Sequence, residues 1–330
     1  MAAPSFLIDY ARRAEPRLRE FLEMKRRAFE RVPVGLLDAF SLLTEYILRG
    51  GKRLRGALVL LGHQAGGGDG ESAFDASIGV ELLHAYLLIH DDFMDRDTER
   101  RGGRTLHVAL GGDHLAGSLA ILLGSLCQAW AYELIGERGA RIVTRTLEEV
   151  TLGQMADLRA PRQAALDAAG VLEVQRLKTG SYTFELPLLL GAILADAHSH
   201  VFDALSAYAR PLGQAFQIAD DLLGTFGSPD ETGKSDAGDL REGKRTLLIA
   251  RALEMASPAD AAALRAGLGD AAADVARLRD IIRRSGAADS ARDEAIRLRD
   301  EALRALSVPA LAAVSEVLSE IAFYTVARST

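Results

Sequence analysis

An apolar run that ends in a cluster of aspartates is the feature that most constrains this chain. The run covers residues 78–89 and leads into His90-Asp91-Asp92-Phe93-Met94-Asp95. In a helix, at about 100° per residue, Asp91 and Asp95 share one side and Asp92 lies at its edge. Crowded carboxylates repel one another unless a cation lies among them, and Mg²⁺ prefers such oxygen ligands. The stretch therefore predicts a magnesium site, rather than a helix end that frays into solvent.

A second acidic pair, Asp220-Asp221, follows another apolar run over residues 204–219, which is interrupted at Pro211. Two helices that each bring aspartates out of an apolar interior predict a cage for more than one metal ion. Metal ions held by aspartates with open coordination positions commonly bridge to substrate phosphates. The two motifs together predict a substrate that carries phosphate.

Composition narrows the class of protein. The chain has 330 residues, of which 48% are hydrophobic, so it can bury a large core. Cys127 is the single cysteine, which excludes an internal disulfide and indicates a reducing compartment. No signal peptide or spanning segment is apparent, and the formal charge of −7 argues against general binding to nucleic acid or anionic membranes. We expect a cytoplasmic protein with no nucleic-acid partner and no integral membrane association.

Helical periodicity runs through the chain, and the alternating pattern of strands is nearly absent. The sequence predicts an all-α fold, one large helical bundle over residues 1–330. Pro187 predicts a kink, and Ser257 before Pro258 predicts an N-cap. The expected helices cover residues 16–31, 36–48, 54–65, 73–95, 112–136, 137–158, 172–194, 199–223, 246–255, 258–268, 274–284, 288–306 and 309–328.

Basic residues gather in three glycine-rich loops. In the first, residues 50–55, Lys52 and Arg55 stand three apart at a helix start, where they share a face beside outward-pointing amides. This arrangement can cradle a diphosphate, although an ordinary basic turn would look the same. The other two loops, residues 97–105 and 233–246, each follow an acidic motif. Lysine and arginine beside a metal cage can hold a diphosphate and stabilise its departure.

These motifs resemble the trans-type isoprenyl diphosphate synthase (polyprenyl synthetase) family, in the expected order and over nearly the whole chain. The motifs that match are Gly-Gly-Lys-Arg-Leu-Arg at 50–55, Asp-Asp-x-x-Asp at 91–95, Arg-Arg-Gly at 100–102, Lys-Thr-Gly at 178–180, Phe-Gln-x-x-Asp-Asp at 216–221, and Gly-Lys at 233–234 and 243–244. The resemblance, closest to the short-chain geranylgeranyl and farnesyl diphosphate synthases, implies an all-helical bundle, usually a homodimer, with a deep cavity between the aspartate motifs. It also implies the reaction. Two or three Mg²⁺ ions help to draw diphosphate off an allylic substrate, and the double bond of isopentenyl diphosphate attacks the resulting cation.

The resemblance further implies roles for single residues. The implied metal ligands are Asp91, Asp95 and Asp220, with Asp92 and Asp221 in support. The implied contacts of the allylic diphosphate are Arg100, Lys178, Lys234 and Lys244. The implied isopentenyl diphosphate site consists of Gly51, Lys52, Arg55, His84 and Arg101. Thr179 and Gln217 would lie near the reacting carbons, Phe216 is a further implied substrate contact, and Arg328 would close over the site.

Two positions bear on how this chain differs from its relatives. Gly224 stands where many relatives have a third aspartate, so the second motif offers two carboxylates. Tyr86 stands five residues before the first aspartate, at the position that often forms the cavity floor in the family. A tyrosine there, followed by Leu87, resembles enzymes that stop at twenty carbons, so we expect geranylgeranyl diphosphate, with farnesyl or longer diphosphates as alternatives. At about 100° per residue, Tyr86 lies about 140° around the helix from Asp91, so helical periodicity alone does not indicate that Tyr86 forms the cavity floor.

Other classes of protein fit fewer residues. A ferritin-like site is suggested by Glu81-x-x-His84, but it needs a second such motif, and none is present. A phosphohydrolase that used His90-Asp91 would leave Asp220 and the basic loops without a role. A terpene cyclase shares the first motif but has no isopentenyl diphosphate to bind. A non-catalytic subunit of a heteromeric prenyltransferase tends to lose the aspartates that this chain keeps.

Overall fold

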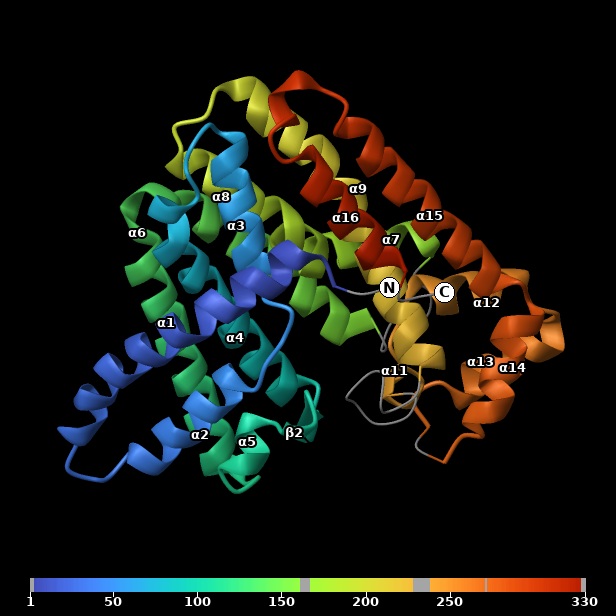
Figure 1. Ribbon diagram of the computed structural model, residues 1–330. Helices are drawn as coiled ribbons and strands as arrows, with labels where there is room; N and C mark the ends of the chain where they lie inside the picture. The colour runs from blue at the N-terminus through green and yellow to red at the C-terminus, as the bar shows by residue number, and fades with distance from the viewer. Residues whose placement is uncertain (1–2, 161–166, 228–237, 271, 328–330) are drawn as a thin grey trace.

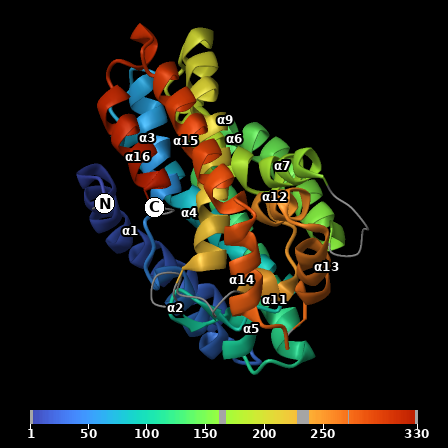
Figure 2. The same cartoon turned by 90° about the vertical axis from the view of Figure 1, so that its right-hand side faces the viewer.

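The computed structural model is built almost entirely from helices (Figures 1 and 2), which confirms the all-α prediction. It describes residues 3–160, 167–227, 238–270 and 272–327. The elements are α1 (Ser5–Glu30), α2 (Leu37–Leu48), α3 (Leu54–Ala65), η1 (Glu71–Ala73), α4 (Phe74–Met94), β1 (Glu99–Arg100), β2 (Gly103–Arg104), α5 (Leu106–Ala109), α6 (His114–Arg159), α7 (Ala168–Gln175), η3 (Arg176–Glu185), α8 (Leu186–Leu194), α9 (Ser199–Phe226), α11 (Gly238–Glu242), α12 (Leu247–Met255), α13 (Pro258–Gly267), α14 (Val275–Arg284), α15 (Ala287–Ala305), η4 (Pro309–Leu311) and α16 (Ser315–Val326).

Helix α9 links the two parts of the core. One cluster of buried apolar side chains draws on α1 to α4, α6 and α8, and the other on α12, α14 and α15. Leu205 and Tyr208 of α9 belong to the first cluster, whereas Ile218 and Leu222 belong to the second. Helix α15 runs beside α9 in both views (Figures 1 and 2). The second acidic motif therefore sits on a helix that is fixed along its length.

The two most apolar long helices pack against other elements. By length and composition alone, residues 71–94 and α6 could each cross a membrane, but 61% and 44% of their most apolar windows are buried inside the protein. Helix α4 packs along α6 and against α3. At Gly79, α4 and α6 come so close that an added Cβ would lie 2.9 Å from the Ala131 carbonyl oxygen of α6. The apolar faces of α4 and α6 thus serve this packing.

The first helix starts earlier than the sequence predicts. Helix α1 begins at Ser5, and Pro16, expected at the start, lies inside it. Proline removes one backbone donor, and here it is exposed on the outer side of the helix. The buried stripe of Tyr10, Ala14 and Leu18 passes the proline without interruption, and its burial outweighs the lost hydrogen bond. Pro211 likewise lies inside a continuous α9.

Two other expected helices are interrupted. The segment 172–194 contains a π-helical stretch, η3, and Pro187 lies in the first turn of α8, where a missing donor costs little. The segment 309–328 divides into η4 and α16; Leu311 of η4 and Val314 of the turn that follows it are buried. The predicted N-cap is confirmed, because Ser257 Oγ accepts the Asp260 amide at 3.2 Å. The β1–β2 hairpin lies in the predicted second basic loop.

Candidate active site

The first acidic motif closes the C-terminal end of α4. Asp91 lies in the last turn and Asp95 caps the helix, with its amide 2.8 Å from the Asp91 carbonyl oxygen. The buried oxygen Asp91 Oδ1 lies 3.1 Å from Lys178 Nζ, and the buried oxygen Asp95 Oδ2 lies 3.3 Å from Lys244 Nζ. Among the described residues, these two oxygens have no other hydrogen-bond donor. Burial and the neighbouring Asp91 raise the pKa of Asp95. Two buried carboxylate oxygens that contact only ammonium groups among the described residues fit a hard divalent cation.

Asp92, between them, has a different environment. Its side chain is fully buried and accepts hydrogen bonds from Tyr46 Oη at 2.6 Å and Arg100 Nε at 2.7 Å. Burial raises its pKa despite the guanidinium beside it. Arg100 also pairs with Asp97 at 2.8 Å. Asp92 thus fastens the β1–β2 hairpin to the end of α4, and its oxygens are already engaged.

Lys178 reaches Asp91 from the π-helical segment η3. Its Nζ lies 3.1 Å from Asp91 Oδ1 and 2.6 Å from Asp157 Oδ2 on α6. Burial alone would lower its pKa, but Asp91, Asp157 and Asp95 outweigh burial and raise it. An added Cβ at Gly153 would lie 2.4 Å from the Lys178 backbone nitrogen, so α6 approaches η3 closely here. The ammonium group is therefore held, charged, beside Asp91.

Lys244 forms an ion pair with Asp95, as Lys178 does with Asp91. Its Nζ lies 3.3 Å from Asp95 Oδ2, 2.9 Å from Glu242 and 3.8 Å from Asp239. Burial would lower its pKa, but Asp239, Asp95 and Glu242 raise it well above the usual value. Asp239 in turn lies against α9, since an added Cβ at Gly224 would come within 2.4 Å of Asp239 Oδ2. Lys244 and Asp239 thus connect the two acidic motifs.

The two aspartates of the second motif differ in exposure. Asp221 is buried and accepts hydrogen bonds from Gln217 Nε2 at 2.8 Å and Gln175 Nε2 at 2.5 Å. Burial, together with the charges of Asp239 and Asp220, raises the pKa of Asp221 to about 8. Asp220 points elsewhere, because adjacent helical positions are about 100° apart, and it is exposed. Asp220 is therefore the better placed of the two to meet a metal ion.

Within the described part of the chain, no three Asp, Glu, His or Cys side chains are placed to hold a metal ion by themselves. The carboxylates of the two acidic motifs therefore do not form one preassembled set of ligands in the described residues. Mg²⁺ requires six oxygen ligands in a regular arrangement and usually keeps several waters. Ions held here would complete their coordination with water and with the oxygens of a phosphate-bearing ligand.

A second basic group surrounds His84 on α4. Arg55 donates to Tyr182 Oη at 3.0 Å and Thr183 Oγ1 at 2.9 Å, and its Nη1 lies 3.3 Å from His84 Nε2. Arg101 Nη2 lies 3.5 Å from the same nitrogen. Burial, followed by the charges of Arg55 and Arg101, lowers the pKa of His84 well below its usual value. His84 is thus a neutral acceptor between two guanidinium groups, which remain available to an anion.

The first glycine-rich loop folds onto this group. Gly51 has φ +129, and an added Cβ would lie 2.9 Å from Arg101 Cζ, so glycine is required there. Arg101 also donates to the Gly50 carbonyl oxygen at 2.6 Å. Lys52 Nζ lies 4.9 Å from the ring centroid of Tyr324 on α16. The structure therefore brings Gly51 and Lys52 near the Arg55–His84–Arg101 group.

The neighbouring Arg53 and Glu81 serve the fold. Arg53 is buried with φ +48, lies 3.4 Å from Glu81 Oε2, and donates to the Ile47 carbonyl oxygen at 2.7 Å. Glu81 Oε1 accepts the Gly56 amide at 2.8 Å. Both Glu81 oxygens are engaged, which removes the ferritin-like reading of Glu81 and His84.

The remaining predicted residues take up varied positions. Thr179 follows Lys178 in η3 and is half-buried. Phe216 meets Phe184 edge to face at 5.8 Å between centroids. Lys234 and Arg328 lie outside the described residues. Sequence reasoning assigned no role to the site neighbours Tyr46, Asp157, Gln175, Tyr182, Asp239 and Glu242. Asp239 and Glu242 lie in the third basic loop, and the other four lie outside every motif.

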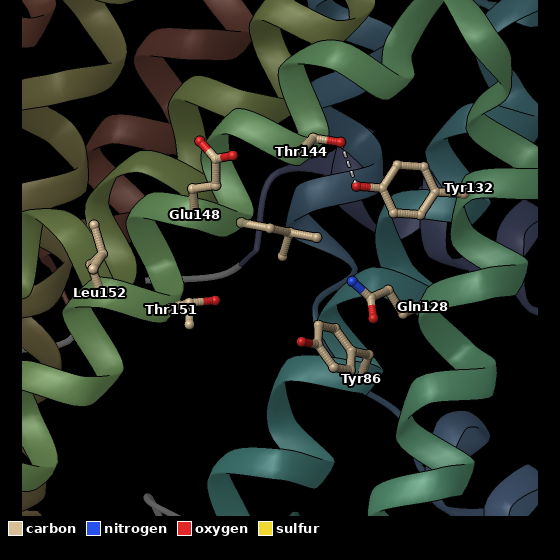
Figure 3. A pocket seen from close by; sticks show the side chains of 8 residues that line it. Tyr86, Gln128, Tyr132, Thr144, Glu148, Thr151 and Leu152 are labelled. Carbon is tan, nitrogen blue, oxygen red and sulfur yellow. Dashed lines mark hydrogen bonds between the residues drawn. The ribbon is translucent and has the colours of Figure 1, made fainter.

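An open groove of about 540 Å³ lies beside Tyr86, between α4 and α6 (Figure 3). Its lining includes Tyr86, Gln128, Tyr132, Leu147 and Thr151. Tyr86 is half-buried, and its ring packs edge to face on His90 at 4.6 Å between centroids. Most of the α6 side chains that line it are exposed, so the groove lies at the surface of α6.

Comparison with known proteins supports one family. The family model described as "Polyprenyl synthetase" matches residues 38–284. Geranylfarnesyl diphosphate synthase of Aeropyrum pernix is 36% identical over 300 residues, which cover 86% of this chain and 92% of that protein. Geranylgeranyl diphosphate synthase of Saccharolobus solfataricus is 32% identical over 282 residues, covering 81% of this chain and 80% of that protein.

A solved structure shows the same fold. It is geranylgeranyl pyrophosphate synthase from Corynebacterium glutamicum, crystallised with isoprenyl diphosphate and magnesium. It superposes with a TM-score of 0.88 at 31% sequence identity, and the match covers 97% of this chain and 98% of that one.

Proposed function

The chain belongs to the polyprenyl synthetase family, and on this basis we propose that it condenses isopentenyl diphosphate with an allylic diphosphate to give a short-chain trans-prenyl diphosphate. It is a prenyltransferase, as its relatives are. One observation carries the proposal. The buried carboxylates of Asp91 and Asp95 lie beside the ammonium groups of Lys178 and Lys244, while a separate group of Arg55, His84 and Arg101 offers a second anion site.

Mg²⁺ fits the first of these sites. We assign Asp91, Asp95 and Asp220 as its ligands, and Asp92 and Asp221 as support for the helix ends, with two or three ions in the complete site. Bound Mg²⁺ neutralises the allylic diphosphate and makes it a better leaving group. The related structure from Corynebacterium glutamicum was crystallised with magnesium and isoprenyl diphosphate, which supports this assignment.

The side chains of this protein would bind and orient both substrates. Lys178 and Lys244, with Arg100 and Lys234, would hold the allylic diphosphate. Lys52, Arg55 and Arg101 would hold isopentenyl diphosphate, with Gly51 supplying backbone and the neutral His84 accepting from the arginines. Thr179, Phe216 and Gln217 would line the space around the reacting carbons. An apolar surround excludes water, which would otherwise capture the allylic cation.

We further propose that the protein is a cytoplasmic homodimer. Large apolar side chains are exposed along the part of α6 that precedes Gly136, including Leu115 at 65% and Leu122 at 61%. A run of this kind on one helix marks an interaction site. A second copy of the chain is its proposed partner, as is usual in the family.

The product that we propose is geranylgeranyl diphosphate. Tyr86 lies five residues before Asp91, about 7.5 Å away along the axis of α4. Its ring stands at the edge of the groove between α4 and α6, and it would stop an elongating hydrocarbon chain. Tyr86→Ala is expected to lengthen the product, and an unchanged product would contradict the assignment of Tyr86 as the floor.

An elongation assay tests the reaction. Purified protein would receive Mg²⁺, labelled isopentenyl diphosphate and, in separate reactions, dimethylallyl, geranyl or farnesyl diphosphate. We expect labelled prenyl products with at least one primer and none in the presence of EDTA. Cyclic hydrocarbons from a primer alone would instead favour a terpene cyclase. Absence of any product would favour a non-catalytic subunit.

Gly224 supplies a further prediction about the second motif. The Asp239 carboxylate occupies the space where a third aspartate would project, so Gly224→Asp would bring two carboxylates into contact and push Asp239 away from Lys244. We expect kcat/KM to fall roughly tenfold, about 1.4 kcal/mol. The double variant Gly224→Asp with Asp239→Ala should recover part of the loss. Higher activity in Gly224→Asp alone would show that Asp239 does not occupy this space.

A further inference from the structure

We propose that Arg49, at the C-terminal end of α2, is a positioning residue, which holds the backbone of the β1–β2 hairpin so that Arg101 can bind isopentenyl diphosphate. The inference rests on the proposed function and adds a residue to its isopentenyl diphosphate site. Three observations carry it: the bonds from Arg49 to the hairpin, the backbone conformation of Arg101, and the unequal anchoring of Arg100 and Arg101.

The guanidinium group of Arg49 binds both strands of the hairpin. Arg49 Nη1 donates to the carbonyl oxygens of Arg104 at 2.7 Å and Arg100 at 3.3 Å. An added Cβ at Gly103 would lie 2.5 Å from Arg49 Cζ, so this glycine lets the guanidinium lie against the hairpin backbone. Glu45, one turn earlier on α2, accepts from Arg49 Nη2 at 3.0 Å. The Arg49 side chain is only 17% exposed, so water competes little for these bonds.

The turn of this hairpin is strained at Arg101. Residues 99 and 100 pair with residues 104 and 103, which leaves Arg101 and Gly102 as the two turn residues. Both have positive φ, +54 at Arg101 and +69 at Gly102. A two-residue turn of this kind favours glycine, asparagine or aspartate, and a bulkier residue with a Cβ adopts it at a cost. Contacts outside the turn must therefore stabilise the conformation of Arg101, and Arg49 supplies one on each strand.

The two arginines of the hairpin have unequal anchors. Arg100 donates to Asp92 at 2.7 Å and pairs with Asp97 at 2.8 Å, so two carboxylates hold its side chain. Arg101 instead donates to the Gly50 carbonyl oxygen at 2.6 Å, which is a neutral acceptor. A guanidinium group binds a carboxylate more strongly than it binds a neutral carbonyl. A shift of the hairpin backbone would therefore displace Arg101 more readily than Arg100.

Arg49 and Arg101 hold the hairpin and the glycine-rich loop together in both directions. The Arg49 side chain binds carbonyls of the hairpin, and the Arg101 side chain binds the carbonyl of Gly50, the residue that follows Arg49. The same loop continues into Gly51 and Lys52, which belong to the proposed isopentenyl diphosphate site. Loss of the Arg49 guanidinium should therefore weaken this site and spare the allylic site.

Steady-state kinetics of Arg49→Met test the inference, with each substrate varied while the other is saturating. We expect the KM of isopentenyl diphosphate to rise about tenfold and that of the allylic diphosphate to change by less than about twofold. Arg49→Lys should give a smaller rise, because an ammonium group can donate to one carbonyl but lacks the planar fork of donors. In an Arg101→Met background, adding Arg49→Met should raise the KM of isopentenyl diphosphate no further, because Arg49 acts through Arg101.

Arg138→Met is the matched control. Arg138 donates to the carbonyl oxygens of Ile193 at 2.8 Å and Leu194 at 3.2 Å, so the variant removes the same kind of contact between α6 and the end of α8. Helix α8 lies at the opposite end of the bundle from β2 (Figure 1). We expect Arg138→Met to leave both KM values unchanged.

Three results would overturn the inference and leave the proposed function intact. They are an unchanged KM of isopentenyl diphosphate in Arg49→Met, equal rises in the KM of both substrates, and a further rise when Arg49→Met is added to Arg101→Met. Absence of elongation by the wild-type protein would overturn both the inference and the proposed function. Thermal unfolding shows whether each variant is folded, and Arg49→Lys, which keeps the positive charge, carries the comparison if Arg49→Met does not fold.

Discussion

Replacing Asp91 by asparagine is expected to lower kcat for the condensation by about 10³-fold, equivalent to about 4 kcal/mol of transition-state stabilisation. The reason lies in the surroundings of Asp91 Oδ1, which is buried beside the Lys178 ammonium and near the second carboxylate of the motif, Asp95. An amide keeps the shape of the side chain but is a poor ligand for a hard cation. Lys178 would keep its other partner, Asp157, so the fold should be preserved.

Steady-state kinetics at saturating Mg²⁺ would measure the effect. Glu99→Gln is the matched control, because it removes one carboxylate from an exposed position in β1, eight residues from Asp91. We expect Glu99→Gln to retain nearly full activity. A wild-type rate in Asp91→Asn would contradict the assignment of Asp91 as a metal ligand.

Replacing Asp92 by alanine is expected to have its main effect on stability. The free energy of unfolding should fall by about 3–5 kcal/mol, because the Arg100 guanidinium would lose a buried anionic partner and Tyr46 Oη would lose its acceptor. Urea denaturation of the two single variants would measure the difference. Asp91→Asn should remain within about 1 kcal/mol of wild type, because the amide oxygen can still accept a hydrogen bond from Lys178, which also keeps its ion pair with Asp157.

The contrast between adjacent aspartates is the informative result. If Asp92→Ala were as stable as the wild-type protein, then Asp92 would not fasten the hairpin to α4. Equal destabilisation by both variants would indicate a general effect of charge at the helix end, and would argue against separate roles for Asp91 and Asp92.

Much of this architecture follows from local patterns. Helical periodicity identifies α3 to the residue and places Asp91 and Asp95 on one side of α4. It also divides α6 near residue 136, where glycine provides the bend. The motif spacing that resembles the polyprenyl synthetase family selects the functional residues. The structure places these motifs at the end of α4, inside η3 and α9, and in glycine-rich loops.

Other features depend on contacts between distant segments. Tyr46 lies 46 residues from Asp92, and its hydrogen bond fixes a carboxylate that sequence spacing leaves at the edge of the motif. Asp239 occupies the space beside Gly224, which the sequence shows only as a missing aspartate. Local rules also start the first helix at Pro16, although the buried stripe around Leu18 carries it past the proline. In each of these three cases, contacts between distant segments determine the local structure, and the local sequence does not.

The central claim is that the aspartates of α4 and α9 together hold the metal ions that bind the allylic diphosphate. The most direct measurement is anomalous scattering from crystals of the protein grown with Mn²⁺ and a non-cleavable allylic thiolodiphosphate. We predict metal peaks in contact with Asp91 and Asp95 on one side of the diphosphate and with Asp220 on the other. Metal peaks at neither motif, with the analogue bound elsewhere, would contradict the claim.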